Sequence, residues 1–133
     1  MKHFAYVLVL VLALAACSSG DDAEGSSVSF GNVSDGDTVS SPLTVEFATD
    51  GDFTIEEAGE INENAGHMHV MVDVDCVAVG EVIPGDDNHI HFGDGSTSAE
   101  LELEPGEHTL CLQAGDGEHT ALDLTDEITV TVE

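Results

Sequence analysis

The sequence places apolar residues at every second position in several short runs, and this spacing constrains the fold more than any other feature. Four runs show it clearly, at residues 43–47, 68–74, 101–103 and 128–132. Successive side chains of a β-strand point to opposite faces, so a period of two is typical of strands with one buried face. Valine, isoleucine and threonine dominate the runs, which also favours strands over helices.

Clusters of glycine, aspartate and proline separate these runs, for example at residues 35–37, 50–52, 105–106 and 115–117. Such clusters are typical of tight turns. About seven short strands at this spacing predict a single all-β domain, an immunoglobulin-like β-sandwich. A cupin-like β-barrel is the alternative architecture. We expect one short helix around Glu56–Asn64.

The start of the chain has the pattern of an export signal. Lys2 precedes an apolar run over residues 4–16 that ends at Cys17. This run is shorter than the roughly 20 residues needed to cross a bilayer, and its basic start is typical of a secretory signal. Leu14-Ala15-Ala16-Cys17 resembles the lipobox of bacterial lipoproteins. The resemblance implies cleavage after Ala16 and lipidation of Cys17.

Three segments are therefore expected: a signal peptide over residues 1–16, a lipidated Cys17 with a flexible acidic linker over 17–27, and a β-sandwich over 28–133. The linker reads CSSGDDAEGSS and lacks large apolar side chains that could pack. The lipid would anchor the protein to a membrane of the cell envelope. Because Ser18 follows the cysteine, the resemblance favours the periplasmic face of the outer membrane in a two-membrane bacterium, and otherwise the outer face of the plasma membrane.

The charge of the chain excludes several classes of partner. It contains 28 acidic residues and a single lysine or arginine, which is Lys2 in the expected signal peptide. A domain without basic side chains does not attract nucleic acid or anionic lipid surfaces electrostatically. Adaptation to concentrated salt, where the screening length falls to about 3 Å at 1 M, and cation binding are the two explanations left open. Of these, a halophilic origin is the favoured one.

Two cysteines, Cys76 and Cys111, lie in the expected β-domain. An even pair in an exported protein indicates a disulfide, and closing this loop would contribute about 3–4 kcal/mol. The expected strand faces do not agree. Cys76 continues the buried valine face of its strand, whereas Cys111 points to the face opposite that of Leu110. A bulge or a strand end would reconcile them. Two separate thiols, or a thiolate metal ligand, are the alternatives.

Histidines form the most informative chemical pattern. His67 and His69 are two apart in one expected strand, and His89 and His91 are two apart in another. Each pair projects to one face, so four imidazoles would share a surface if the strands are neighbours. That face lies opposite the apolar stripe, which predicts outward-facing histidines. His119 follows a turn and could complete a site, whereas His108 is interpreted as a partly buried structural histidine.

The four paired histidines and His119 are candidate metal ligands. Imidazole suits copper and zinc, and Met68 or Met71 nearby would favour copper. Calcium bound by acidic turns is the alternative, through Asp86, Asp87 and Asp94, although no stretch matches the twelve-residue calcium loop. A surface cluster of solvated or mutually hydrogen-bonded histidines remains the non-metal interpretation.

The order of several motifs resembles the family of small exported bacterial proteins termed domain of unknown function 4399. The motifs begin at residues 66–73, continue through 83–84, 88–93 and 105–110, and end at 115–119. The resemblance implies that one domain spans roughly residues 28–133, and it implies no activity. The family commonly has histidine where this chain has Met68 and Leu122, and its pattern lacks the two cysteines.

A lipid-anchored envelope protein that binds copper or zinc is the expected function. No catalytic serine or cysteine constellation and no phosphate-binding loop is recognisable, so we expect a protein that is not an enzyme. One alternative is a non-catalytic envelope module that binds a protein or a polysaccharide. Another is a metalloenzyme acting on oxygen species.

Overall fold

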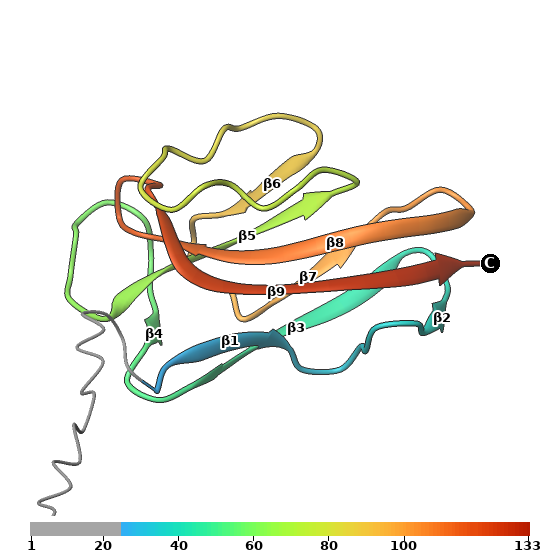
Figure 1. Cartoon of the computed structure of the whole chain (residues 1–133), viewed down its shortest axis with the longest axis horizontal. Helices are drawn as coiled ribbons and strands as arrows, with labels where there is room; N and C mark the ends of the chain where they lie inside the picture. Colours follow the sequence, from blue (N-terminus) through green and yellow to red (C-terminus); the bar gives the residue numbers. More distant parts are fainter. Residues whose placement is uncertain (1–24) are drawn as a thin grey trace, which may run out of the picture.

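A computed structural model describes residues 25–133 and shows an all-β domain (Figure 1). No residue in this range is helical. The strands are β1 (Ser27–Phe30), β2 (Thr38–Val39), β3 (Leu43–Asp50), β4 (Thr54–Ile55), β5 (Ala65–Val72), β6 (His89–Phe92), β7 (Ser98–Leu101), β8 (Gly106–Gly115) and β9 (Ala121–Val132).

Two sheets form the domain. One has the order β1-β3-β7, and the other has the order β2-β9-β8-β5-β4, with β6 also paired to β5. In sequence order, β1, β3 and β7 match strands A, B and E of an immunoglobulin-like sandwich, and β5, β8 and β9 match C, F and G. The predicted all-β sandwich is therefore confirmed. The structure has nine strands rather than about seven, since β2 and β4 are two residues long and too short to show alternation.

The core between the sheets is built from the alternating residues. Val45 and Phe47 of β3 face Met68 and Val70 of β5 and Val130 of β9 within one buried cluster. Apolar side chains on one face of each strand leave water together, which stabilises the sandwich by about 25 cal/mol per Å² of buried apolar surface. β5 is thereby fixed as a central strand. Its second face, which points away from this core, does not have to supply core residues and can carry polar side chains.

The prediction of a helix around Glu56–Asn64 is wrong, because this segment is a loop. Its backbone groups bond to distant parts of the chain instead of closing helical turns. The N–H of Ala58 donates to the carbonyl of Gly93, and the N–H of Gly59 donates to that of Gly117. Gly59 and Asn64 both have positive φ, at 138° and 54°, which a helix does not permit.

Residues 73–88 cover the second face of β5 and β8. β5 ends at Val72, and Asp73 adopts a left-handed φ of 58° that turns the chain onto this face. A disulfide joins Cys76 of this segment to Cys111 of β8. The side-chain amide of Gln113 donates to the carbonyl of Val77 and accepts from its N–H, both at 2.8 Å. The strand end at Asp73 is the feature that reconciles the facing of the two cysteines.

The predicted signal peptide, the lipidated Cys17 and most of the acidic linker lie outside the described residues. Over residues 25–133, no helix has the length and apolarity needed to cross a membrane.

Candidate metal centre

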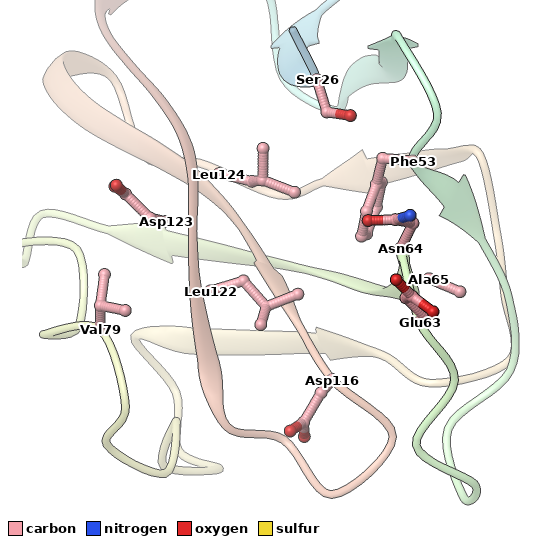
Figure 2. A pocket seen from close by; sticks show the side chains of 10 residues that line it. All are labelled: Ser26, Phe53, Glu63, Asn64, Ala65, Val79, Asp116, Leu122, Asp123 and Leu124. Carbon is pink, nitrogen blue, oxygen red and sulfur yellow. The ribbon is translucent and has the colours of Figure 1, made fainter. Parts of the chain in front are cut away.

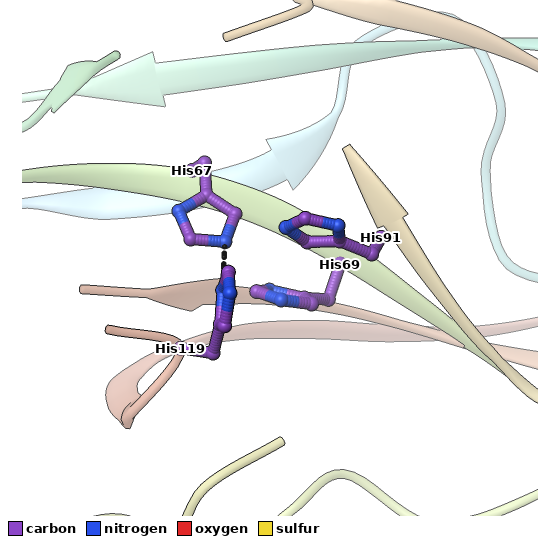
Figure 3. Close-up of side chains that lie close together, drawn as sticks. All are labelled: His67, His69, His91 and His119. Atoms are coloured by element: carbon purple, nitrogen blue, oxygen red, sulfur yellow. Dashed lines mark hydrogen bonds between the residues drawn. The ribbon is translucent and has the colours of Figure 1, made fainter. Parts of the chain in front are cut away.

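Four histidines from three elements of the fold meet at one point (Figure 3). His67 and His69 come from β5, His91 from β6, and His119 from the turn between β8 and β9. β5 and β6 are antiparallel neighbours in which His69 lies directly opposite His91. Opposite residues of an antiparallel pair project to the same face. The strand pairing therefore assembles three imidazoles, and the turn adds the fourth.

The spacing of the rings suits a single metal ion. One potential ligand atom from each histidine lies within 4.8 Å of the corresponding atoms of the other three. Ring centroids are 4.6 Å apart for His67 and His69 and 4.6 Å apart for His91 and His119. Four nitrogens around a tetrahedral zinc ion would be roughly 3.3 Å apart for Zn–N bonds of about 2.0 Å. Small side-chain rotations would close the cluster on an ion.

Two of the four histidines are buried, contrary to the outward facing that the alternation predicts. His67 is 0% exposed and His69 is 1% exposed, whereas His91 is exposed and His119 is intermediate. His67 and His69 do face away from the main core, as the period of two requires. The loop over residues 73–88 covers that face of the sheet, and its Ile83 packs with Met71 of β5 in a second buried cluster. Strand alternation cannot reveal a covering loop, so it cannot distinguish solvent from a second buried layer.

Burial keeps these imidazoles neutral at physiological pH. Burial, followed by the nearby His91 and His119 rings, lowers the pKa of His67 to about 4. Burial and the other three rings lower the pKa of His69 to about 3. The pKa of His91 is also lowered, by burial and then by His119. Neutral imidazoles have the free lone pairs that metal coordination requires.

Hydrogen bonding among the rings accounts for little of this arrangement. Nδ1 of His119 lies 2.9 Å from Nε2 of His67, in the single hydrogen bond between members of the cluster among the described residues. Nδ1 of His67 and Nδ1 of His69 are buried without a partner in this part of the chain. An unpaired buried polar group costs about 1–3 kcal/mol. The cluster is therefore not a self-satisfied hydrogen-bond network.

Asp116 holds the turn that presents His119. Its Oδ1 accepts from the N–H groups of Glu118 and Thr120, each at 2.9 Å, and its carbonyl accepts from the N–H of His119. His119 itself has a φ of 68°, in the left-handed region that non-glycine residues rarely adopt. Residues in such conformations concentrate at functional sites. The carboxylate of Asp116 thus fixes a strained backbone that aims His119 at the other three rings.

Two glycines make room for the rings. A Cβ atom on Gly93 would overlap the ring of His91, and a Cβ atom on Gly115 would lie 2.8 Å from Cε1 of His69. A side chain at either position would force the neighbouring imidazole to shift from its present place. Sequence reasoning missed these glycines and Asp116. For Gly93, the sequence did contain a usable indication, because this glycine lies two residues after a candidate ligand in the motif His91-Phe92-Gly93.

His89, a predicted ligand, is not brought into the cluster. It lies opposite Met71 at the first position of β6, and its Nδ1 is 2.7 Å from Oδ1 of Asp86. This hydrogen bond is the leading cause of the lowered pKa of Asp86. The face assigned to His89 by alternation is correct, but a local carboxylate binds its ring.

His108 is paired in the same manner. Its Nδ1 is 2.7 Å from Oδ2 of Asp73, and its Nε2 is 2.7 Å from the carbonyl of Glu104. These two bonds, in that order, raise the pKa of His108. With a side chain that is 14% exposed, it connects the loop after β5 to β8.

The candidate methionine and carboxylate ligands lie elsewhere. Met68 packs in the main core, and Met71 packs with Ile83, Cys111 and Ala121. Of the calcium candidates, Asp86 bonds to His89 and Asp94 bonds to Ser96. The histidine cluster is the only group of three or more potential ligands from histidine, cysteine, aspartate and glutamate among the residues that the structure describes.

A cavity of about 540 Å³ opens near the start of β5 and β9 (Figure 2). Apolar side chains such as Phe53, Leu122 and Leu124 line it, with Glu63, Asp116 and Asp123 among its polar residues. None of the four clustered histidines contributes to its lining. The candidate ligand atoms of the cluster all lie within 4.8 Å of one another, a spacing that suits an ion rather than an organic molecule.

Comparison with known families agrees with the motif order. Residues 45–133 match the model described as "Domain of unknown function (DUF4399)", and they include all four clustered histidines. Neither the curated proteins nor the solved structures contain a match to this chain. The matched region covers more than half of the chain, and the protein therefore belongs to the DUF4399 family.

Proposed function

We propose that this protein binds one copper or zinc ion through His67, His69, His91 and His119, and that it does so as a lipid-anchored component of a bacterial cell envelope. One observation carries the proposal. Four imidazoles converge within 4.8 Å, two of them completely buried, and only one hydrogen bond links them within the described region. Burial of uncompensated imidazoles is costly, and coordination of a shared ion would offset that cost.

The donor set favours a borderline transition metal. All four candidate ligands are imidazoles, which suit copper, zinc and nickel, whereas calcium and magnesium prefer oxygen. The neutral ligands would leave a divalent ion with its full charge. The 28 acidic residues of the chain supply a field that attracts such a cation, subject to salt screening.

The number of ligands favours a binding role over catalysis. Four protein ligands complete the tetrahedral shell of zinc, whereas catalytic zinc sites usually keep one position open for water or substrate. We therefore propose a non-catalytic role in holding or delivering the ion. Anchoring through Cys17 would keep the site outside the cytoplasm. There it would meet copper and zinc ions that enter the cell envelope.

Titration of metal-free protein with copper and with zinc tests the proposal. His91→Ala and His89→Ala form a matched pair, because both residues lie on β6 and are two positions apart, yet only His91 joins the cluster. We expect one ion per chain and a loss of affinity in His91→Ala but not in His89→Ala. Absence of binding at micromolar metal, or equal effects of the two substitutions, would rule out the proposed site.

A further inference from the structure

The cluster has a closed side and an open side. His67 and His69 are buried on β5, whereas His91 is exposed on β6 and His119 is partly exposed on its turn. Figure 3 shows the rings of His91 and His119 beside the two rings from β5. An ion held by all four would be covered from the β5 side, so a second molecule could reach it only past His91 and His119.

One ligand on the open side, His91, is also attached to a less extensively paired strand. β5 has eight residues and is paired on both edges, with β8 on one side and β4 and β6 on the other. β6 has four residues and pairs with β5 alone among the described strands. Segments with few backbone hydrogen bonds open locally at lower free-energy cost. His91 should therefore detach from an ion more readily than His67 and His69, whereas the turn of His119 is held by bonds to Asp116 and Ile83.

Apolar side chains flank the turn that carries His119. The large exposed hydrophobic residues of the described region are Ile61, Val79 and Val82, at 59%, 60% and 65% exposure. Their loops bond to this turn: the N–H of Gly59 donates to Gly117, that of Gly80 to Ala121, and that of Ile83 to His119. Exposed apolar groups that gather beside a site are typical of contact surfaces.

If the protein binds a metal ion as proposed above, we infer that it exchanges this ion directly with another molecule on the His91–His119 side. A nitrogen or sulfur donor of an incoming protein or peptide would replace His91 and then His119, while His67 and His69 still hold the ion. Each step exchanges one metal–ligand bond for another and needs no oxidant or reductant. Since the chain carries a formal charge of −27, the contacting surface of that molecule would be neutral or basic around an apolar centre.

The rate law of metal transfer tests this inference. Zinc-loaded protein would be mixed with increasing concentrations of the chelator pyridylazoresorcinol at fixed ionic strength. Direct replacement predicts a transfer rate that rises in proportion to chelator concentration, since chelator and protein share the ion transiently. A rate independent of chelator concentration would mean that the ion first leaves unaided, and would overturn the inference. Failure of zinc to bind at all would instead remove the proposed function.

Substitutions at the open side test the route. Ile61→Trp and Val82→Trp place bulk beside the His119 turn, whereas Ser40→Trp adds the same bulk at an exposed position next to β2. We expect the first two to slow transfer severalfold with unchanged zinc affinity, and Ser40→Trp to leave the rate unchanged. Equal transfer rates in all three variants, with affinity retained, would show that the ion does not pass this side.

Discussion

The histidines of this protein occupy two contrasting environments. His67, His69, His91 and His119 are grouped with one another, and no carboxylate belongs to their cluster. His89 and His108 each bond a carboxylate, Asp86 and Asp73, at 2.7 Å. The only lysine or arginine of the sequence is Lys2, so histidine is the only side chain of residues 25–133 that can become a cation beside these acids.

This contrast separates two uses of the same side chain. A carboxylate partner favours the protonated imidazole, and the pKa of His108 is accordingly raised. Burial among other imidazoles favours the neutral form, and the pKa values of His67 and His69 fall to about 4 and about 3. A neutral imidazole is a metal ligand, and a protonated one is not. Within the described residues no carboxylate hydrogen-bonds a ring of the four histidines that could bind an ion, although Asp116 and Asp94 lie near enough to His67 and His91 to oppose part of the lowering of their pKa values.

The largest effect is expected from removing a buried ligand. His69→Ala should reduce copper or zinc affinity by more than the 10–100-fold that loss of a supporting residue around a metal typically costs. His108→Ala, which removes a carboxylate-paired ring, should leave affinity unchanged. Calorimetric titration measures both, and circular dichroism verifies that each variant is folded. Similar losses of metal affinity in the two variants would contradict the proposal that only the clustered histidines bind the ion.

A smaller loss is expected when a ring is displaced rather than removed. Gly93→Ala places a methyl group where the His91 ring lies, so metal affinity should fall about tenfold. Gly85→Ala is the matched control, because a Cβ atom there contacts nothing within 4 Å. Both can be compared by competition with a chelator. An unchanged affinity in Gly93→Ala would show that His91 does not need its present position.

The two environments should also respond oppositely to pH. The pKa values of His67 and His69 lie below the usual 6.5, so the unfolded state binds more protons between about pH 6.5 and 3. These two histidines should therefore leave the stability of the metal-free protein unaffected above pH 6.5 and should lower it as the pH decreases through this range. Urea unfolding at several pH values measures it. A His67→Ala/His69→Ala variant that retained the full acid dependence would contradict this assignment.

The smallest effect is expected at His108. Its pKa is raised, so its pairing with Asp73 stabilises the protein below pH 6.5, and this contribution is lost as the pH rises through the raised value. Exposed ion pairs contribute about 0–1 kcal/mol, and the loss in His108→Gln should lie within that range. Thermal unfolding at pH 5.5 and at pH 9 compares the two states. A larger loss at pH 9 would reverse the predicted sign.

The sequence was sufficient to predict the fold class, because alternation in β3, β5 and β9 directly reports which residues face the core. It also identified His67, His69, His91 and His119 as candidates. It could not exclude His89, since the bond to Asp86 depends on a local turn that alternation does not describe. Nor could it predict that His67 and His69 are buried, because that depends on how residues 73–88 fold back over the sheet.

The segment over residues 56–64 shows the same limit. Its composition permits a helix, but its backbone bonds to Gly93 and Gly117 pull it into a loop beside the histidine cluster. Long-range bonds of this kind decide local structure where intrinsic helix propensity is weak.

X-ray absorption spectroscopy of the zinc-loaded protein tests the central claim most directly, because it reports the atoms bound to the ion. Coordination by His67, His69, His91 and His119 predicts a shell of four nitrogens at about 2.0 Å with the outer scattering of four imidazole rings. A shell of oxygen atoms without imidazole scattering would place the ion on the acidic surface of the protein, and would contradict a histidine-built metal centre.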